Sequence, residues 1–134
     1  MNLRLYSDGG ARGNPGPAAF AVLVCKEDGT ILYEKAECIG TATNNEAEYR
    51  GLIAAILLAI EYRAEKAEFV MDSELVIKQM LGQYKVRSLR LKDLHADATA
   101  LAAEIPHVSY HHVKRNDPMI SRADRLLNKA LDSC

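Results

Sequence analysis

The stretch that decides the fold is Leu3-Arg4-Leu5-Tyr6-Ser7-Asp8-Gly9-Gly10-Ala11-Arg12-Gly13-Asn14-Pro15-Gly16-Pro17. Leu3 and Leu5 alternate with Arg4 and Tyr6, and this period of two predicts a short β-strand. We expect the strand to end at Asp8, because the glycines and prolines beyond it favour a turn. Asp-Gly pairs are also common in ordinary hairpin turns, so this stretch alone leaves open whether Asp8 is functional or only shapes the turn.

The length of 134 residues suits one globular domain, and we predict that residues 1–134 form a single domain. The residues are 49% hydrophobic and 26% charged, which is typical of a folded chain and not of a disordered one. The longest apolar run, over 52–60, is far shorter than the ~20 residues of a bilayer span, and the N-terminus lacks a signal-peptide pattern. We therefore expect a cytoplasmic protein that does not enter membranes.

Cysteines and net charge point to no particular chemistry. Cys25, Cys38 and Cys134 are odd in number and lack metal-ligand spacing, so we interpret them as thiols in a reducing compartment rather than as disulfides or zinc ligands. The formal net charge of −1 is unusual for a protein that binds nucleic acid. Basic residues still gather over 78–92 and 114–129, where they form either solvated helix faces or a local binding surface.

The rest of the chain alternates strand-like and helix-like patterns. Apolar runs and alternation predict strands over 18–25, 31–39, 67–71 and 107–113. Helical periodicity predicts a helix that follows the polar linker over 40–45 and runs to about 63, and further helices from 75 onward, over 89–103 and over 121–131. Thr43, Asn44 or Asn45 is suited to cap the first of these helices. Strands mixed with helical crossovers predict an α/β domain, in which sites tend to lie beyond the strand ends.

Glu48 is an acid on the wrong side of its predicted helix. At about 100° per residue it falls beside Leu52 and Ala55, opposite a solvent stripe in which Glu46 is expected to pair with Arg50. A buried, unpaired carboxylate costs several kcal/mol, so Glu48 needs a partner, a metal ion or access to a cleft. The alternative is a carboxylate that stabilises the helix N-terminus.

Two further acids stand in comparable places. Asp72 follows a predicted strand, although an aspartate there can also be a helix N-cap. Asp124 shares a predicted helix face with Leu127 and Leu131, where an apolar residue is expected. With Asp8, these acids suggest one cluster, and carboxylates that repel one another are usually gathered to hold divalent cations.

Four motifs of this sequence resemble the successive motifs of type 1 ribonuclease H. They are Tyr6-Ser7-Asp8-Gly9-Gly10-Ala11-Arg12-Gly13-Asn14-Pro15-Gly16, Thr43-Asn44-Asn45-Glu46-Ala47-Glu48, Met71-Asp72-Ser73-Glu74-Leu75-Val76 and Arg122-Ala123-Asp124-Arg125-Leu126-Leu127-Asn128. They occur in the right order and cover nearly the whole chain. The resemblance implies an α/β ribonuclease H-like fold, a five-stranded mixed sheet flanked by helices. It places the family's catalytic, metal-binding acids at Asp8, Glu48, Asp72 and Asp124.

The resemblance also implies an activity. Type 1 ribonucleases H are metal-dependent endonucleases that hydrolyse the RNA strand of RNA–DNA hybrids, leaving a 5′-phosphate and a 3′-hydroxyl. Two Mg²⁺ ions, or Mn²⁺ in their place, would lie ~4 Å apart and be bridged by Asp8. Asp124 would help to hold the ion that activates water, and Glu48 and Asp72 the ion at the leaving 3′-oxygen. The chain is expected to act on the hybrid as a monomer, without an obligate protein partner.

Substrate contacts follow from the same resemblance. Asn14, Asn44 and Asn45 carry amides able to donate to and accept from the ribose 2′-hydroxyl, the group that distinguishes RNA from DNA. Each of them is also a favoured turn or cap residue. The other expected substrate contacts are Gly9, Thr43 and Arg115.

The sequence departs from better-known members of the family at two places. The loop over 113–121 has Lys114, Arg115 and Asp117 but no histidine, and Ile120 stands where asparagine is common. The segment over 83–92 is too short for the basic helical protrusion with which some relatives grip the hybrid. The missing histidine supports an alternative, a binding module without turnover, although four clustered acids argue against it. A nuclease acting on DNA strands is a third reading, which the Asn44-Asn45 pair disfavours.

Overall fold

The protein, described over residues 1–134 by a computed structural model, is built from five strands and four helices. In chain order these are β1 (Asn2–Ala11), β2 (Gly16–Lys26), β3 (Ile31–Ala42), α1 (Asn44–Glu61), β4 (Lys66–Met71), α2 (Glu74–Met80), α3 (Leu89–Ala102), β5 (His107–His112) and α4 (Pro118–Ser133). None of the helices has the length and apolar character that a membrane crossing requires.

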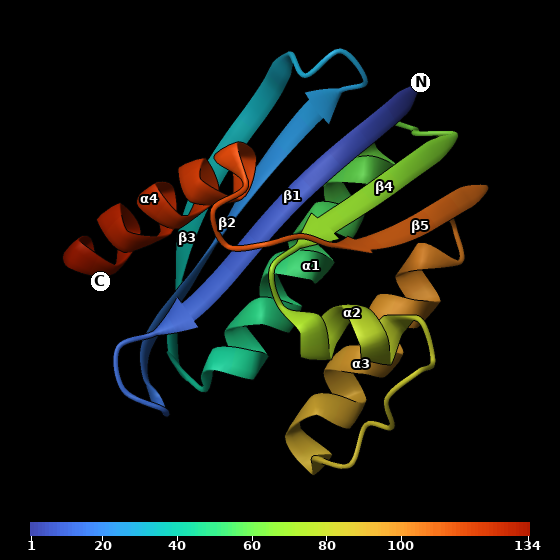
Figure 1. The fold of residues 1–134 in the computed structure, drawn as a ribbon. Coiled ribbons are helices and arrows are strands. Elements are labelled where there is room, and N and C mark those ends of the chain that lie inside the picture. The colour runs from blue at the N-terminus through green and yellow to red at the C-terminus, as the bar shows by residue number, and fades with distance from the viewer.

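The strands form one mixed sheet in the order β3-β2-β1-β4-β5. β1, β2 and β3 run antiparallel, whereas β4 is parallel to β1 and β5 is parallel to β4. α1 to α3 lie on one side of this sheet, and α4 crosses β1, β2 and β3 on the other (Figure 1). The α/β fold with a five-stranded mixed sheet and flanking helices is therefore confirmed.

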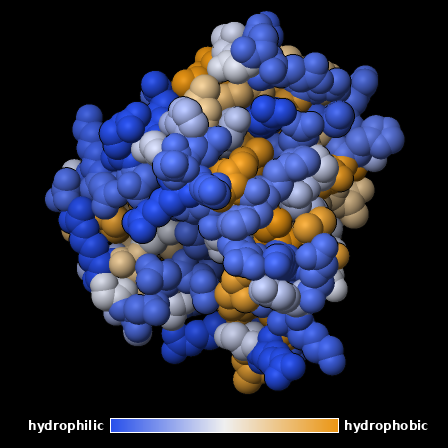
Figure 2. All heavy atoms as spheres, in the orientation of Figure 1, coloured by the Kyte–Doolittle hydropathy of each residue, from blue (hydrophilic) through white to orange (hydrophobic).

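Two hydrophobic layers hold the helices to the sheet. Leu3 and Leu5 belong to the larger layer, which includes Leu52 of α1, whereas Tyr6 belongs to the layer under α4 with Leu127. The alternation predicted for the first strand is thus correct. Burying one such leucine contributes about 1.5–3 kcal/mol. Seen in the orientation of Figure 1, hydrophilic residues cover most of the surface, and hydrophobic ones show in small patches among them (Figure 2).

β1 does not end at Asp8, as the sequence suggested, but continues to Ala11. Asp8 lies opposite Ala21 in β2, and the antiparallel pairing continues to the end of β1. Gly9 serves a close approach rather than a turn. A methyl group at Gly9 would lie 2.3 Å from the carbonyl carbon and oxygen of Ala47, so α1 can rest on β1 only because Gly9 has no side chain.

The helix starts are fixed by capping side chains. Thr43 caps α1 in a reciprocal capping box, in which the Glu46 carboxylate accepts the Thr43 N–H at 3.0 Å. The expected pair between Glu46 and Arg50 is absent, because Glu46 is held back toward Thr43 and meets Arg90 instead. α4 begins at Pro118, three residues before the predicted start at 121, because Asp117 accepts two main-chain N–H groups of its first turn.

The interpretation of all cysteines as unpaired thiols is wrong. Cys38 of β3 and Cys134, the last residue, form a disulfide across a sequence separation of 96 residues. Cys25 stays free and buried. No spacing signal could indicate this pair, because only the folding of α4 across β3 brings the two residues together. The cysteines thus no longer support a reducing compartment.

Candidate metal centre and nucleic-acid cleft

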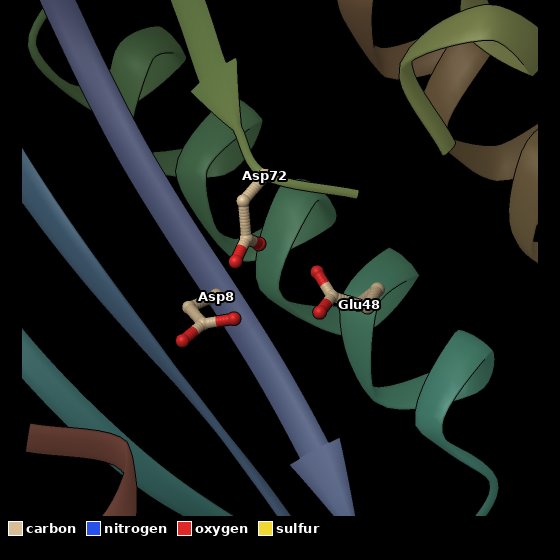
Figure 3. Close-up of side chains that lie close together, drawn as sticks. All are labelled: Asp8, Glu48 and Asp72. Atoms are coloured by element: carbon tan, nitrogen blue, oxygen red, sulfur yellow. The ribbon is translucent and has the colours of Figure 1, made fainter. Parts of the chain in front are cut away.

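Three carboxylates converge on one point of the structure. Asp8 projects from β1, Glu48 from the second turn of α1, and Asp72 from the residue after β4 (Figure 3). One oxygen of each lies within 4.8 Å of one oxygen of each of the others. The cluster therefore joins three segments that are distant in the sequence.

Sheet pairing and two small residues bring these acids together. β1 and β4 pair in parallel as far as Tyr6 and Val70, so Asp8 and Asp72 both lie two residues beyond the last pair. On α1, a methyl group at Gly51 would lie 3.2 Å from the Asp8 carbonyl oxygen, which shows how closely the helix crosses β1 there. Glu48 lies between these two contacts on α1, since Ala47 meets Gly9 and Gly51 meets Asp8.

The alternative structural roles of the three acids are taken by other residues. The chain turns beyond β1 at residues 12–15, so Asp8 is not a turn residue. Ser73, not Asp72, is the N-cap of α2, since its side chain accepts the Val76 N–H. Thr43 and Glu46 complete the capping of α1 without Glu48. No local structural need therefore explains why these positions are acidic.

Asp124 faces the same cleft from the opposite helix. The cleft has a volume of about 560 Å³, and all four predicted acids line it. Asp124 stands outside the group of three whose oxygens lie within 4.8 Å. Its charge still reaches the cluster, because it contributes to the raised pKa of Asp8 and of Asp72. The structure thus brings the four acids to one cavity with Asp124 at its edge.

Burial and mutual repulsion raise the pKa values of the cluster. Burial, followed by the charges of Asp72 and Asp124, raises the pKa of Asp8 to about 7. Burial and the charges of Asp8 and Asp72 raise the pKa of Glu48 well above its ordinary value. Burial also raises the pKa of Asp72, and the Arg115 guanidinium partly opposes that rise. The cluster therefore resists carrying its full negative charge unless a cation compensates it.

The donor set fits a divalent cation. Oε2 of Glu48 is buried and has no hydrogen-bond partner, and it is the only side-chain oxygen or nitrogen in the protein in that condition. Buried acceptors without partners are rare, because losing hydration costs about 1–3 kcal/mol or more. Hard cations such as Mg²⁺ and Mn²⁺ prefer carboxylate oxygens. An ion among the three acids would satisfy the Glu48 oxygen and relieve the repulsion.

The asparagines at the cleft are more constrained than the sequence suggested. Oδ1 of Asn44 accepts the Ala11 N–H at 2.8 Å, and Oδ1 of Asn14 accepts the Asn44 N–H at 2.9 Å. These bonds tie the β1–β2 turn to the start of α1 and leave the side-chain NH₂ groups as donors. Asn45 lines the cleft and makes no side-chain hydrogen bond, so it can both donate and accept.

The remaining predicted contacts take different positions. Gly9 and Arg115 line the cleft, whereas Asn14 and Thr43 do not. Thr43 is engaged as the cap of α1, and its hydroxyl oxygen accepts the Glu46 N–H at 3.2 Å. His111 and His112 also lie outside the cleft, and His111 Nε2 is hydrogen-bonded to the Ser109 hydroxyl at 2.9 Å.

Sequence reasoning did not assign three polar residues of the cleft, Arg12, Ser73 and Asn128, to the site. Asn128 lies one helical turn beyond Asp124 and donates to the Asp124 carbonyl at 2.9 Å, so the spacing of four from a candidate acid was an available signal. Arg12 forms an ion pair with Asp132 at 2.6 Å and donates to the Asn128 carbonyl at 3.3 Å. Only the fold brings Arg12 to α4.

Comparison with known proteins places this geometry in a family. A family profile described as reverse transcriptase-like matches residues 6–130. The bifunctional protein Rv2228c of Mycobacterium tuberculosis is 44% identical over 134 residues, which cover 99% of this chain and 36% of that protein. The chain therefore spans about a third of the length of this curated relative.

Two crystal structures match over nearly the whole chain. RNase H1 from the halophilic archaeon Halobacterium salinarum NRC-1 has a TM-score of 0.94 and 39% identity, with 100% of both chains covered. LC11-RNase H1 in complex with an RNA/DNA hybrid has a TM-score of 0.92 and 39% identity, with 98% of both chains covered. The similarity thus extends over the complete sheet and all four helices.

Proposed function

Because this chain belongs to the type 1 ribonuclease H family of enzymes, we propose that it cuts the RNA strand of RNA–DNA hybrids internally, leaving a 5′-phosphate and a 3′-hydroxyl. The observation that carries the proposal is the cluster of Asp8, Glu48 and Asp72 around a buried, unpartnered carboxylate oxygen. A related protein of the same fold is crystallised with an RNA/DNA hybrid, which supports this substrate.

Asp8, Glu48, Asp72 and Asp124 would hold two Mg²⁺ ions, with Mn²⁺ as a substitute. Bound ions of this kind lower the pKa of water and compensate the charge of a phosphate under attack. Asp8, whose pKa is raised by burial and by the charges of both Asp72 and Asp124, would help to hold both ions. Oxygens of Glu48 and Asp72 lie within 4.8 Å of one of Asp8, and Asp124 lines the same cleft from α4.

Residues in the cleft and beside it would select ribose and orient the strand. Asn45 can accept from and donate to a 2′-hydroxyl, whereas Asn14 and Asn44 have only their NH₂ groups free to donate. Gly9 and Thr43 would contribute by keeping the start of α1 against β1. Arg115 stays protonated at any working pH, so it can attract the cleaved phosphate but cannot transfer a proton.

The test is a cleavage assay on labelled RNA–DNA, RNA–RNA and DNA–DNA duplexes with Mg²⁺, Mn²⁺ or EDTA. We expect internal cleavage of the RNA strand in the hybrid with either metal, none in EDTA, and intact control duplexes. Product ends are checked by ligation, which requires the 5′-phosphate. Equal cleavage of DNA–DNA would contradict the substrate proposal. Binding of the hybrid without cleavage would favour the alternative, a binding module that lacks the loop histidine.

We also propose that residues 1–134 act as one domain and as a monomer. All four acids line one cleft of one chain, so the site needs no residue from a second copy. Light scattering on the purified protein, with and without hybrid, tests this expectation. The cytoplasmic location stays a prediction from the sequence.

A further inference from the structure

Gln79, near the end of α2, has a buried polar side chain that the proposed chemistry does not use. Only 4% of the residue is exposed. Its Oε1 accepts a hydrogen bond of 2.5 Å from the Tyr49 hydroxyl, and its Nε2 donates one of 3.3 Å to the Lys85 carbonyl. Its main-chain carbonyl faces Nε2 of His95 at 3.2 Å. Gln79 therefore joins α1 and α3 to the segment that follows α2.

That segment, residues 81–88, connects α2 to α3 without helix or strand (Figure 1). Among the main-chain groups of residues 85–87, only the Lys85 carbonyl forms a hydrogen bond within the protein, and its donor is the Gln79 amide. Val86 adds a half-buried apolar contact. One buried amide and one apolar side chain thus fix the path of this part of the chain.

The same segment carries exposed cations. Lys85 and Arg87 are exposed and take part in no ion pair. Arg90, at the start of α3, lies 3.6 Å from the Glu46 carboxylate. Glu46 follows Asn45 in the sequence, and Asn45 lines the cleft. Arg90, three residues beyond Arg87, therefore brings the end of this basic run to the start of α1, which borders the cleft.

We propose that Gln79 is a positioning residue for substrate binding, which presents Lys85 and Arg87 to the phosphates of the hybrid by holding the Lys85 carbonyl. The inference rests on the proposed function, because the hybrid is the polyanion that the cleft would receive. Cations that replace counterions on phosphates supply affinity that does not depend on sequence. A chain without a basic protrusion has few such cations, so the placement of each one matters more.

The experiment measures binding and cleavage of the hybrid by Gln79→Met as a function of salt. Methionine keeps the length of the side chain and removes both hydrogen bonds. We expect KM to rise by about three- to tenfold with kcat within about twofold, since the lost contacts are to phosphate and not to the reacting atoms. The slope of log affinity against log salt, measured by fluorescence anisotropy in Ca²⁺, should fall by about 1 to 2.

Two comparison variants separate positioning from stability. Tyr49→Phe removes the other hydrogen bond of the Gln79 amide and leaves the one to Lys85, so it should leave KM and the salt slope at the wild-type values. Lys85→Ala/Arg87→Ala should reproduce the lower slope, and adding Gln79→Met to it should change KM by less than about twofold, because the positioned cations are already gone.

Three outcomes would overturn the inference. The first is a wild-type salt slope in Lys85→Ala/Arg87→Ala, and the second is a wild-type salt slope in folded Gln79→Met. The third is that Gln79→Met raises KM as much in the Lys85→Ala/Arg87→Ala background as it does in wild type. The first outcome decides the matter even if Gln79→Met fails to fold, because Lys85 and Arg87 are exposed. Wild-type protein that binds the hybrid without cutting it would instead contradict the proposed function, and the binding comparison would still decide the role of Gln79.

Discussion

Two neighbouring residues of α1, Glu48 and Tyr49, belong to two different buried polar clusters. We call them the acid cluster (Asp8, Glu48 and Asp72) and the amide cluster (the side chains of Tyr49 and Gln79 and the Lys85 carbonyl). They differ in whether their buried polar atoms have hydrogen-bond partners. The Tyr49 hydroxyl donates to Gln79, whose amide in turn donates to the Lys85 carbonyl. Glu48 faces Asp8 and Asp72, and its Oε2 has no partner. A satisfied cluster holds elements together, whereas a cluster of unpaired acids costs stability and is explained only by something it binds.

The largest expected effect is a loss of cleavage activity when an acid of the acid cluster is replaced. Asp8→Asn should lower the cleavage rate by roughly 10³-fold or more, because several kcal/mol of charge stabilisation are lost if this carboxylate holds the ions as proposed, and each 1.4 kcal/mol is about tenfold. The metal-free fold should stay intact or become slightly more stable, since one repelling charge is removed. Hybrid cleavage and thermal unfolding in EDTA measure the two effects. A folded variant that still cleaves would show that Asp8 is not a metal ligand.

The second expected effect is a change of the free energy of unfolding with pH, which arises in the acid cluster. The pKa of Asp8 is raised to about 7, above the ~3.9 of an unfolded chain. The folded protein therefore binds the Asp8 proton more tightly than the unfolded chain does, and this difference stabilises the fold at low pH. The stabilisation is complete below pH ~3.9 and is lost as pH rises through about 7, and it amounts to roughly 4 kcal/mol at most. In EDTA, this contribution to the free energy of unfolding should therefore fall between pH 4 and pH 8.

Urea titrations of wild type and Asp8→Asn, in EDTA and in Mg²⁺, measure this dependence. The asparagine variant should lose much of the fall, and Mg²⁺ should reduce it in wild type by compensating the charges. An equally steep fall in wild type and variant, both in EDTA, would place the titration elsewhere in the protein.

Tyr49→Phe should give the opposite result to Asp8→Asn, with reduced stability and retained activity. Removing the hydroxyl leaves Oε1 of Gln79 buried without a donor, which costs about 1–3 kcal/mol. Chemical denaturation measures the loss, and cleavage kinetics should show kcat within about twofold of wild type. A large loss of activity in a folded variant would mean that the two clusters are coupled through α1.

Sequence reasoning could locate the acid cluster but not the amide cluster. Glu48 and Asp124 stood out because an acid interrupted an apolar helix face, and Asp8 and Asp72 because each stood at the end of a strand-like run. The resemblance of the motifs then pointed to all four. Gln79 interrupts nothing in the pattern of α2, and its partner on the loop is a main-chain carbonyl that no side chain signals. Contacts of that kind are fixed by tertiary packing alone, as is the pairing of Cys38 with Cys134.

A smaller effect is expected at the rim of the acid cluster. Asn45→Ala should raise KM for the hybrid by about fivefold, the equivalent of the ~1 kcal/mol of one hydrogen bond, without changing the Mg²⁺ dependence. Asn2→Ala, an exposed asparagine at the far end of β1, is the matched control. In Ca²⁺, wild type should bind the hybrid more tightly than a DNA duplex of the same length. Equal affinity would exclude recognition of the 2′-hydroxyl.

The smallest expected effect is at the histidines, which lie outside both clusters. His111 and His112 end β5 and do not line the cleft, whereas Arg115 does. In saturating Mg²⁺, which compensates the charge of Asp8, we expect no ionisation near the ~6.5 of a free histidine to control turnover, because arginine cannot act as a general acid or base. The rate should instead rise toward alkaline pH with the ionisation of the attacking water.

His111→Ala and His112→Ala should each leave kcat within a few-fold of wild type, whereas Arg115→Ala should slow product release. Single-turnover and steady-state kinetics distinguish the two steps, because slow release lowers only the steady-state rate. A pH–rate profile with a limb near neutrality in wild type that is lost in either histidine variant would mean that a histidine from β5 takes over proton transfer. His112 would then be the residue concerned, since its charge already reaches Asp72.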